Sequence, residues 1–242
     1  MTLTLAPKTA RDRLILALDV PNVDAAKRAV EATDGAVGVY KVGLQLVFAG
    51  GLPFAEELAL SGHRVFLDVK LLDIDNTVAH AVQSIMAMGM TFVTLHAYPK
   101  AIRAAIEAKS LAGRGGGAGP CLLGVTVLTS MDDGDLADAG YAVGARELVL
   151  KRARDARAAG LDGLVCSPQE VAAVREAVGA GMVLVTPGIR PAGDAAGDQK
   201  RIMTPRDAIR AGSDYLVIGR PIMAAANPRA AAERIVEEMA GA

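Results

Sequence analysis

Charged and hydroxyl-bearing side chains stand at or near the ends of the first five apolar runs of this 242-residue chain. They are Asp19, Lys41, the pair Asp68 and Lys70, His96, and the pair Thr129 and Ser130. Asp68 and Lys70 are two residues apart, so both side chains leave the same face of an extended strand. Charges buried together need opposite partners, which predicts a self-neutralising array made of Lys41, Asp68, Lys70 and Asp73. A lysine held beside carboxylates keeps its proton and can act as a general acid.

A second candidate site lies near the end of the sequence, where 186–191 reads TPGIRP and 218–222 reads IGRPI. Gly219 lets the backbone approach a ligand closely, Arg220 adds positive charge, and Pro221 suits the first turn of a helix. The loop 193–201 is polar and contains glycine, so it could cover a ligand, with Gln199 and Arg190 as anion contacts. These segments predict a phosphate pocket.

The elements that must position these residues alternate between strand and helix. Short apolar runs predict eight strands, at 14–20, 37–42, 64–70, 91–96, 122–128, 163–167, 182–186 and 215–219. Helical spacing predicts helices at 24–32, 53–60, 76–88, 101–112, 145–159, 168–177, 205–211 and 229–239. Continuously apolar strands are typical of parallel sheets covered by helices. We therefore expect an α/β fold, a single (β/α)8 barrel domain over 1–242, whose strands all end at one functional mouth.

A doubly wound open sheet is the structural alternative, but its dinucleotide-binding glycines should follow the first strand. Here Pro21 and Asn22 stand at that place. The glycine-rich segment 113–119 comes after a helix and before a strand, which is the reverse of the required order. We interpret it as a linker.

Composition excludes several classes of partner. The chain has 26 Lys and Arg against 27 Asp and Glu, a net charge of −1, which argues against nucleic-acid binding. The amino-terminal residues lack the pattern of a signal peptide or a membrane span. Cys121 and Cys166 lie in apolar runs without metal-binding spacing, so we expect reduced core cysteines and a cytoplasmic protein.

The run 68–77, DVKLLDIDNT, resembles the Asp-x-Lys-x-x-Asp-Ile-x-Asn-Thr signature of the orotidine 5′-phosphate decarboxylase family. Further family segments follow in the family's order: LALD ending at Asp19, YKVG at 40–43, GVTVLTS at 124–130, TPGIRP at 186–191, DQ-x-R at 198–201 and IGRPI at 218–222. Leu72 and Asp75 depart from the His and Pro of many bacterial members, and Tyr98 to Lys100 replaces a small, glycine-rich segment. We interpret these departures as local variation.

The resemblance implies loss of CO2 from orotidine 5′-phosphate to give UMP, the last step of pyrimidine biosynthesis, with neither cofactor nor metal. Lys70 would stabilise and protonate the carbanion at C6, Asp68 would face the departing carboxylate, and Lys41 and Asp73 would complete the catalytic array. The implied substrate contacts are Asp19, Lys41, Asp73 and Thr77 for the ribose, Thr129 or Ser130 for the pyrimidine, and Pro187, Arg190, Gln199, Gly219 and Arg220 for the phosphate.

The resemblance also implies a homodimer in which Asp73 and Thr77 enter the neighbouring subunit's site. Two other functions stay open. One is a Mg2+-dependent sugar-phosphate decarboxylase or aldolase of the same superfamily, although such enzymes typically carry an acidic residue where Lys41 stands. The other is a non-catalytic nucleotide-binding barrel.

Overall fold

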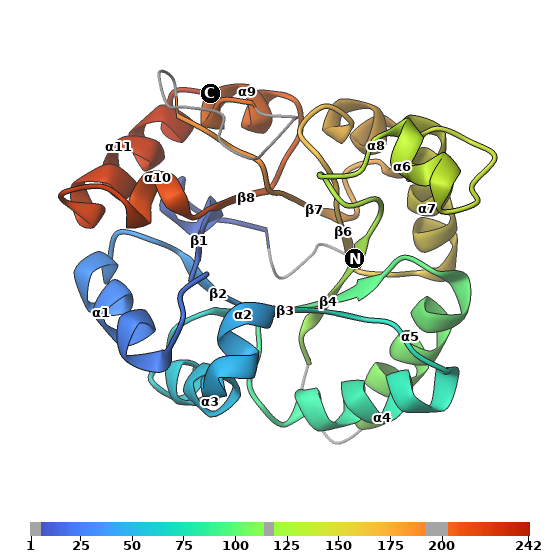
Figure 1. Ribbon diagram of the computed structural model, residues 1–242, viewed down its shortest axis with the longest axis horizontal. Helices are drawn as coiled ribbons and strands as arrows, with labels where there is room; N and C mark the ends of the chain where they lie inside the picture. Colours follow the sequence, from blue (N-terminus) through green and yellow to red (C-terminus); the bar gives the residue numbers. More distant parts are fainter. Residues whose placement is uncertain (1–5, 114–118, 192–202) are drawn as a thin grey trace.

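A computed structural model describes residues 6–113, 119–191 and 203–242 and contains a closed barrel of parallel strands in chain order (Figure 1). The strands are β1 (Leu14–Ala17), β2 (Val39–Gly43), β3 (Val65–Leu71), β4 (Phe92–His96), β5 (Cys121–Val125), β6 (Gly163–Val165), β7 (Val183–Thr186) and β8 (Tyr215–Ile218). All eight predicted strands are confirmed, and β8 pairs with β1 to close the barrel.

Helices surround the barrel on its outside, as Figure 1 shows. The predicted helices correspond to α1 (Val23–Thr33), α3 (Leu52–Leu60), α4 (Asp75–Met86), α5 (Pro99–Gly113), α7 (Ala145–Ala159), α8 (Val171–Val178), α9 (Pro205–Arg210) and α11 (Pro228–Ala240). Helix α8 begins three residues later than predicted, because Pro168 to Glu170 form a turn in which Ser167 donates a hydrogen bond to Glu170.

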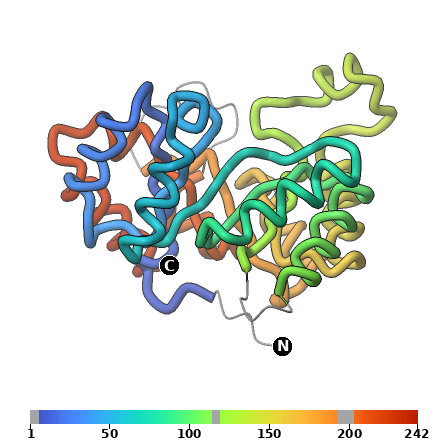
Figure 2. Tube along the Cα trace, turned by 90° about the horizontal axis from the view of Figure 1, so that it is seen from below, coloured from blue at the N-terminus to red at the C-terminus, as the bar shows by residue number. Residues whose placement is uncertain are grey.

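Several short elements are additional to those predicted from helical spacing. They are the 3-10 turn η1 (Arg11–Arg13), α2 (Leu44–Leu46), the π-helical turn η2 (Val47–Gly51) and α6 (Asp133–Asp138). The short helix α10 (Arg220–Met223) lies where the phosphate-pocket prediction places a helix start, with Pro221 in its first turn. Figure 2 shows the yellow-green segment that carries α6 standing out from the rest of the molecule.

The strands are continuously apolar because both of their faces are buried. Alternate strand residues, among them Ile15, Phe66, Phe92 and Tyr215, form a cluster made only of strand side chains, which fills the barrel interior. The residues between them, such as Leu14 and Leu16, pack against the surrounding helices in a second, larger cluster. This layered packing fixes which side of each strand end faces the mouth.

Side-chain caps fix the starts of the helices that flank the barrel opening. Asn22 and Asn227 accept backbone N–H groups at the first turns of α1 and α11, and Asp132 forms a reciprocal capping box with Asp135 at α6. Each cap satisfies backbone donors that the helix itself leaves unpaired.

Strand β3 is irregular near its carboxyl end. Its register against β4 shifts between Leu67 and Leu71, and Lys70 adopts a left-handed backbone conformation with φ of 50°. A lysine rarely adopts this conformation, because its Cβ crowds the backbone there. The irregularity therefore falls on the strand that carries the predicted general acid.

Cys121 and Cys166 are free and buried, in agreement with the sequence. Burial raises the pKa of the Cys166 thiol to about 12, so this side chain stays protonated at neutral pH. No helix in the three described ranges combines the length and apolar character needed to cross a membrane.

Candidate active site

A cavity of about 580 Å3 opens at the carboxyl ends of the strands, and most of the predicted site residues line it. These are Asp19, Lys41, Asp68, Lys70, Thr129, Pro187, Arg190, Gly219 and Arg220. Apolar side chains such as Phe66, Val125 and Val217 form other parts of the wall. The barrel thus brings together residues that lie up to 201 positions apart in the sequence.

Four of the charges form one alternating chain across the cavity wall. The Lys41 Nζ atom lies 2.9 Å from Asp19 Oδ1 and 3.5 Å from Asp68 Oδ2. The other oxygen of Asp68, Oδ1, accepts a 2.8 Å hydrogen bond from Lys70 Nζ. Parallel pairing of β1, β2 and β3 places these residues side by side, with Lys41 opposite Ala17 and Gly43 opposite Asp68.

Burial and charge act in opposite directions on Asp68. Burial alone would raise the pKa of the Asp68 carboxyl, but the ammonium groups of Lys41 and Lys70 and the hydrogen bonds from Lys70 and Thr94 lower it below its ordinary value. Asp68 is therefore a carboxylate at neutral pH. The Lys41 residue is only 7% exposed and gains its compensation from the two aspartates.

Thr94, in β4, contacts the array and was not predicted from the sequence. Its hydroxyl accepts the backbone N–H of Lys70 at 3.0 Å and donates to Asp68 Oδ1 at 2.9 Å. A buried threonine in an apolar strand gives no sequence signal for such a role, because the role depends on the neighbouring irregular strand.

Gly43 is a second residue that sequence reasoning missed. A Cβ atom at this position would lie 2.8 Å from Lys41 Nζ and 3.2 Å from Asp19 Oδ1. Only glycine leaves room for this ion pair at the end of β2. Its place in the YKVG segment, directly after the predicted strand 37–42, was the available signal.

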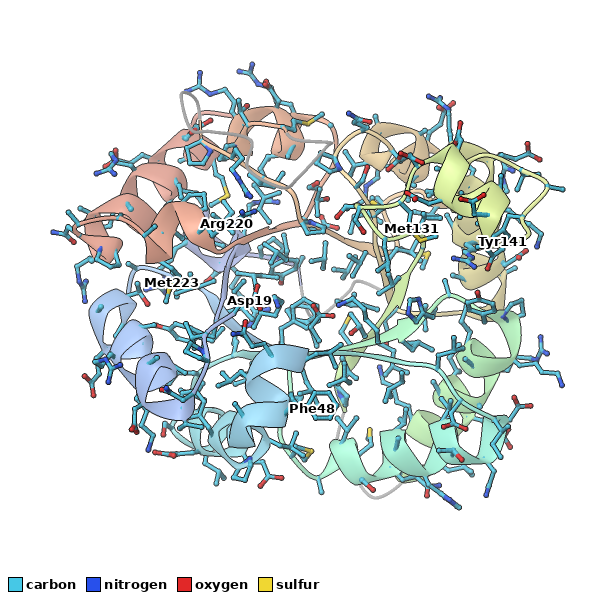
Figure 3. The ribbon with its side chains drawn as sticks, viewed as in Figure 1. Asp19, Phe48, Met131, Tyr141, Arg220 and Met223 are labelled. Atoms are coloured by element: carbon cyan, nitrogen blue, oxygen red, sulfur yellow. The ribbon has the colours of Figure 1, made fainter. Side chains whose placement is uncertain are left out.

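The part of the cavity wall formed by the ends of β7 and β8 carries the predicted phosphate residues. Arg190 and Arg220 both line the cavity, and Gly219 precedes α10 with its Cα close to β1, since an added Cβ would meet Ala17 Cβ at 3.3 Å. Figure 3 shows Asp19 and Arg220 on the inner side of the ring of helices, near β1 and β8. Gln199 and the loop 193–201 lie outside the described residues.

The sequence left open whether Thr129 or Ser130 contacts the ligand, and the two residues differ in position in the segment after β5. Thr129 lines the cavity, whereas Ser130 is exposed and is absent from the lining within the described part of the chain. Arg152 of α7 donates a hydrogen bond to the carbonyl of Thr126, which fixes the strand end just before this segment.

Tyr98 belongs to the segment that departs from the family pattern, and it packs beside the same arginine. Its ring lies under the Arg152 guanidinium at 4.6 Å, and its hydroxyl lies 2.6 Å from that of Tyr141. Burial, followed by the positive charges of Arg152 and Lys70, lowers the pKa of His96. The surroundings of His96 therefore favour its neutral imidazole form.

Asp73 and Thr77 do not line the cavity of their own chain, as far as the described residues go. Both are exposed, and Asp73 Oδ1 accepts the backbone N–H of Ile74 at 2.6 Å. Exposed apolar side chains are found on the same segment and on η2, with Ile74 at 73% and Phe48 at 85% exposure. Of the four residues predicted to form the charged array, Lys41, Asp68 and Lys70 therefore meet within one chain, where Asp19 joins them. Asp73 lies apart from them.

The arrangement can bind an anion at one side and place a reacting carbon beside an ammonium group at the other. The Lys70 ammonium is held next to Asp68, and the cavity between it and the two arginines has room for a nucleotide-sized ligand. Fixed charges in a water-poor site stabilise charge that develops during a reaction.

Comparisons with known proteins show which family the sequence and the fold resemble. Residues 12–235 match the model of the "Orotidine 5'-phosphate decarboxylase / HUMPS family". A Rhodopseudomonas palustris (strain BisB5) protein called orotidine 5′-phosphate decarboxylase is 60% identical over 96% of both chains, and one from strain BisA53 is 56% identical over 98% of both. The crystal structure of orotidine 5′-phosphate decarboxylase from Lactobacillus acidophilus is similar with a TM-score of 0.83 at 35% identity, covering 93% of this chain and 98% of that one.

Proposed function

This chain belongs to the orotidine 5′-phosphate decarboxylase / HUMPS family. We propose that the row of four charges in its cavity wall catalyses the decarboxylation without a cofactor. The enzyme converts orotidine 5′-phosphate to UMP in pyrimidine biosynthesis. The observation that carries the mechanism is the alternating order Asp19, Lys41, Asp68 and Lys70 on one cavity wall.

Lys70 is the proton donor in this mechanism. When the bond between C6 and the carboxylate breaks, its electron pair stays on C6 in the plane of the pyrimidine ring, and CO2 leaves as a neutral molecule. The Lys70 ammonium stabilises this pair and then transfers one proton to C6, and solvent returns a proton to the amine. The 2.8 Å contact with Asp68 supports this role, because it holds the Lys70 ammonium group in a fixed place on the cavity wall.

Asp68 and Lys41 provide fixed charges near the reacting carbon. The carboxylate of Asp68 lies where it would repel the substrate's carboxylate, and this repulsion disappears as neutral CO2 forms. Lys41 bridges Asp68 and Asp19, so it fixes both carboxylates in place. Preorganised charges of this kind need no rearrangement during the reaction.

The remaining cavity residues bind the parts of the substrate that do not react. Thr129 contacts the pyrimidine, Asp19 and Lys41 contact the ribose hydroxyls, and the phosphate lies at the arginine side of the cavity. The phosphate contacts are Pro187, Arg190, Gln199, Gly219 and Arg220. Binding energy gained at the remote phosphate can be used to order the reacting end.

The functional unit in this proposal is a homodimer in the cytoplasm. Asp73 and Thr77 enter the neighbouring subunit's cavity and contact its ribose, and Asp73 completes its charged array. Both residues are exposed, as are the apolar Ile74 on the same segment and Phe48 on η2, and this exposure supports an isologous interface.

The magnesium-dependent alternative is disfavoured by the charge pattern. Asp19 and Asp68 are the carboxylates of the cavity wall that could bind a cation, and both already lie within 3.5 Å of the Lys41 ammonium. A metal ion there would have to displace or neutralise that lysine. A non-catalytic nucleotide-binding barrel is disfavoured because nucleotide binding alone does not require an ammonium group and a carboxylate, Lys41 and Asp68, to be buried together in the cavity wall.

The proposal is tested by following the absorbance of orotidine 5′-phosphate in metal-free buffer containing EDTA. We expect turnover that the chelator leaves unchanged, and a loss of at least about 10³-fold in Lys70→Ala. Chelator-sensitive turnover would support the sugar-phosphate alternative, and tight UMP binding without CO2 release would support the non-catalytic one.

A further inference from the structure

Thr94 connects two catalytic residues through a single hydroxyl group. The residue is fully buried in β4, and its Oγ1 atom accepts the backbone N–H of Lys70 and donates to Asp68 Oδ1. A hydroxyl has only one proton. Because the Lys70 N–H already points at the oxygen, that proton is committed to the Asp68 carboxylate.

The first of these bonds stabilises an unusual backbone. Lys70 has φ of 50°, and the register of β3 against β4 shifts between Leu67 and Leu71. At such an irregularity the regular hydrogen-bond ladder is interrupted, and Thr94 supplies a side-chain acceptor for the Lys70 N–H in place of a strand carbonyl. A buried N–H without an acceptor is costly, so Thr94 favours the left-handed conformation over a regular strand.

The second bond acts on the direction of the carboxylate. Asp68 Oδ1 receives both Lys70 Nζ at 2.8 Å and the Thr94 hydroxyl at 2.9 Å, while Oδ2 faces Lys41. Two donors on one oxygen and one cation on the other hold the carboxylate plane in one orientation. The same hydroxyl therefore fixes the backbone of Lys70 and the Asp68 carboxylate that its ammonium group contacts.

We propose that Thr94 is a positioning residue for the decarboxylation, acting through the backbone of Lys70 and the carboxylate of Asp68. Thr94 does not line the cavity in the described part of the chain, so it affects the reaction without touching substrate. This inference rests on the proposed function, since it assigns Thr94 a role in the chemistry at Lys70.

The test is Thr94→Val, which keeps the shape of the side chain and removes the hydroxyl. We expect kcat to fall by about 10- to 100-fold with KM changed by less than about threefold, because a small displacement of the reacting group affects the chemical step more than binding. Thr94→Ser, which retains the hydroxyl, should restore kcat to within about threefold of the unsubstituted enzyme.

Thr33→Val is the matched control. Thr33 is equally buried, its hydroxyl donates to the Ala29 carbonyl in α1, and it is not among the described residues that line the cavity. This variant should lose stability but keep kcat. If Thr94→Val fails to fold, Thr94→Cys replaces it, because cysteine is close to serine in size but hydrogen-bonds weakly, and kcat should then be at least about tenfold lower in the Cys variant than in the Ser variant.

A crystal structure of Thr94→Val provides a readout that does not depend on turnover. We expect Lys70 to leave the left-handed region and its Nζ to move away from Asp68 Oδ1. An unchanged kcat, an equal loss in Thr94→Ser, or an unmoved Lys70 would each overturn the positioning role. Absence of CO2 release in the unsubstituted enzyme would instead overturn the proposed function. The crystal structure would still show whether Thr94 positions Lys70 and Asp68.

Discussion

The Lys70 ammonium donates a 2.8 Å hydrogen bond to Asp68 Oδ1, and only one residue separates the two in sequence. Two side chains so close in the chain can meet at this distance because the backbone between them leaves the regular strand at Lys70. The contact places a proton donor and its stabilising carboxylate on one wall of the cavity. It also makes Asp68 the central charge of the site, since Lys41 lies at its other oxygen.

The first prediction concerns stability and pH. The pKa of Asp68 is lower in the folded protein than its ordinary value of 3.8, because its two lysines and hydrogen bonds outweigh burial. Its contribution to folding is therefore complete above that ordinary value and is lost as the pH falls toward the lower folded pKa. Urea unfolding should show Asp68→Asn less stable than the unsubstituted protein at pH 7, with a difference that shrinks between about pH 5 and pH 3.

The control for this measurement is Asp138→Asn, which changes an exposed carboxylate at the end of α6. Its difference from the unsubstituted protein should stay small throughout the same pH range. A difference for Asp68→Asn that grows on acidification would contradict the direction assigned to the pKa of Asp68.

The second prediction concerns the space beside Lys41. In Gly43→Ala the new methyl group would lie 2.8 Å from Lys41 Nζ, so the ammonium must move away from Asp19 or Asp68. We expect kcat/KM to fall by about 10- to 100-fold, as is typical of small displacements in a catalytic site. Steady-state kinetics measure this, and Gly181→Ala, where the added methyl group meets nothing within 4 Å, should behave like the unsubstituted enzyme.

The third prediction concerns the phosphate side of the cavity. Removing the Arg220 guanidinium deletes a charge-assisted contact to the phosphate, so Arg220→Ala should raise KM for orotidine 5′-phosphate by roughly 10- to 100-fold. The nucleoside orotidine has no phosphate, and its kcat/KM should change much less. Arg154→Ala, an exposed arginine of α7, serves as the control. Equal losses with both substrates would show that Arg220 acts elsewhere.

The fourth prediction concerns the proposed exchange of Asp73 between subunits. Lys70→Ala and Asp73→Ala are each expected to be inactive. Refolded or exchanged together in equal amounts, they should regain about one quarter of the activity of the unsubstituted enzyme, because half of the dimers are hybrids and each hybrid has one intact site. Activity measured against mixing time would follow the exchange of subunits.

A mixture of Lys70→Ala and Asp68→Ala is the decisive comparison. Both residues line the cavity of their own chain, so every site in a hybrid keeps one lesion and the mixture should stay inactive. Recovery in this mixture, or failure of the first mixture to recover although hybrids form, would contradict the shared site.

Much of the fold could be predicted from the sequence, because strands buried on both faces appear in it as short, continuous apolar runs. Runs such as Leu14–Ala17 and Cys121–Val125 are apolar at every position, and each could be recognised without its neighbours. The short helices α2 and α6 could not, since three or six residues carry too little periodicity. Helix α8 began late because a turn stabilised by Ser167 and Glu170 occupies the predicted start.

The site was predictable where function requires a particular charge at a strand end, as at Lys41 and Arg220. A residue that acts only by contacting one of these charged side chains could not be predicted. Thr94 contributes through a strand irregularity that no residue type encodes, and Gly43 contributes by the absence of a side chain. The sequence also could not show which of the adjacent hydroxyls of Thr129 and Ser130 lines the cavity. That depends on the backbone conformation of the segment after β5.

The pairing of β1 with β8 has a consequence for the synthesis of the protein. Leu14 aligns with Leu216, so the hydrogen-bonding edge of the first strand stays uncovered until the ribosome has released nearly the whole polypeptide. The same late step brings Gly219 and Arg220 beside β1, whose part of the cavity wall was translated much earlier. A nascent chain that stops before residue 215 would therefore expose an unpaired strand edge and lack Gly219 and Arg220, so closure of the barrel and completion of the anion site occur together.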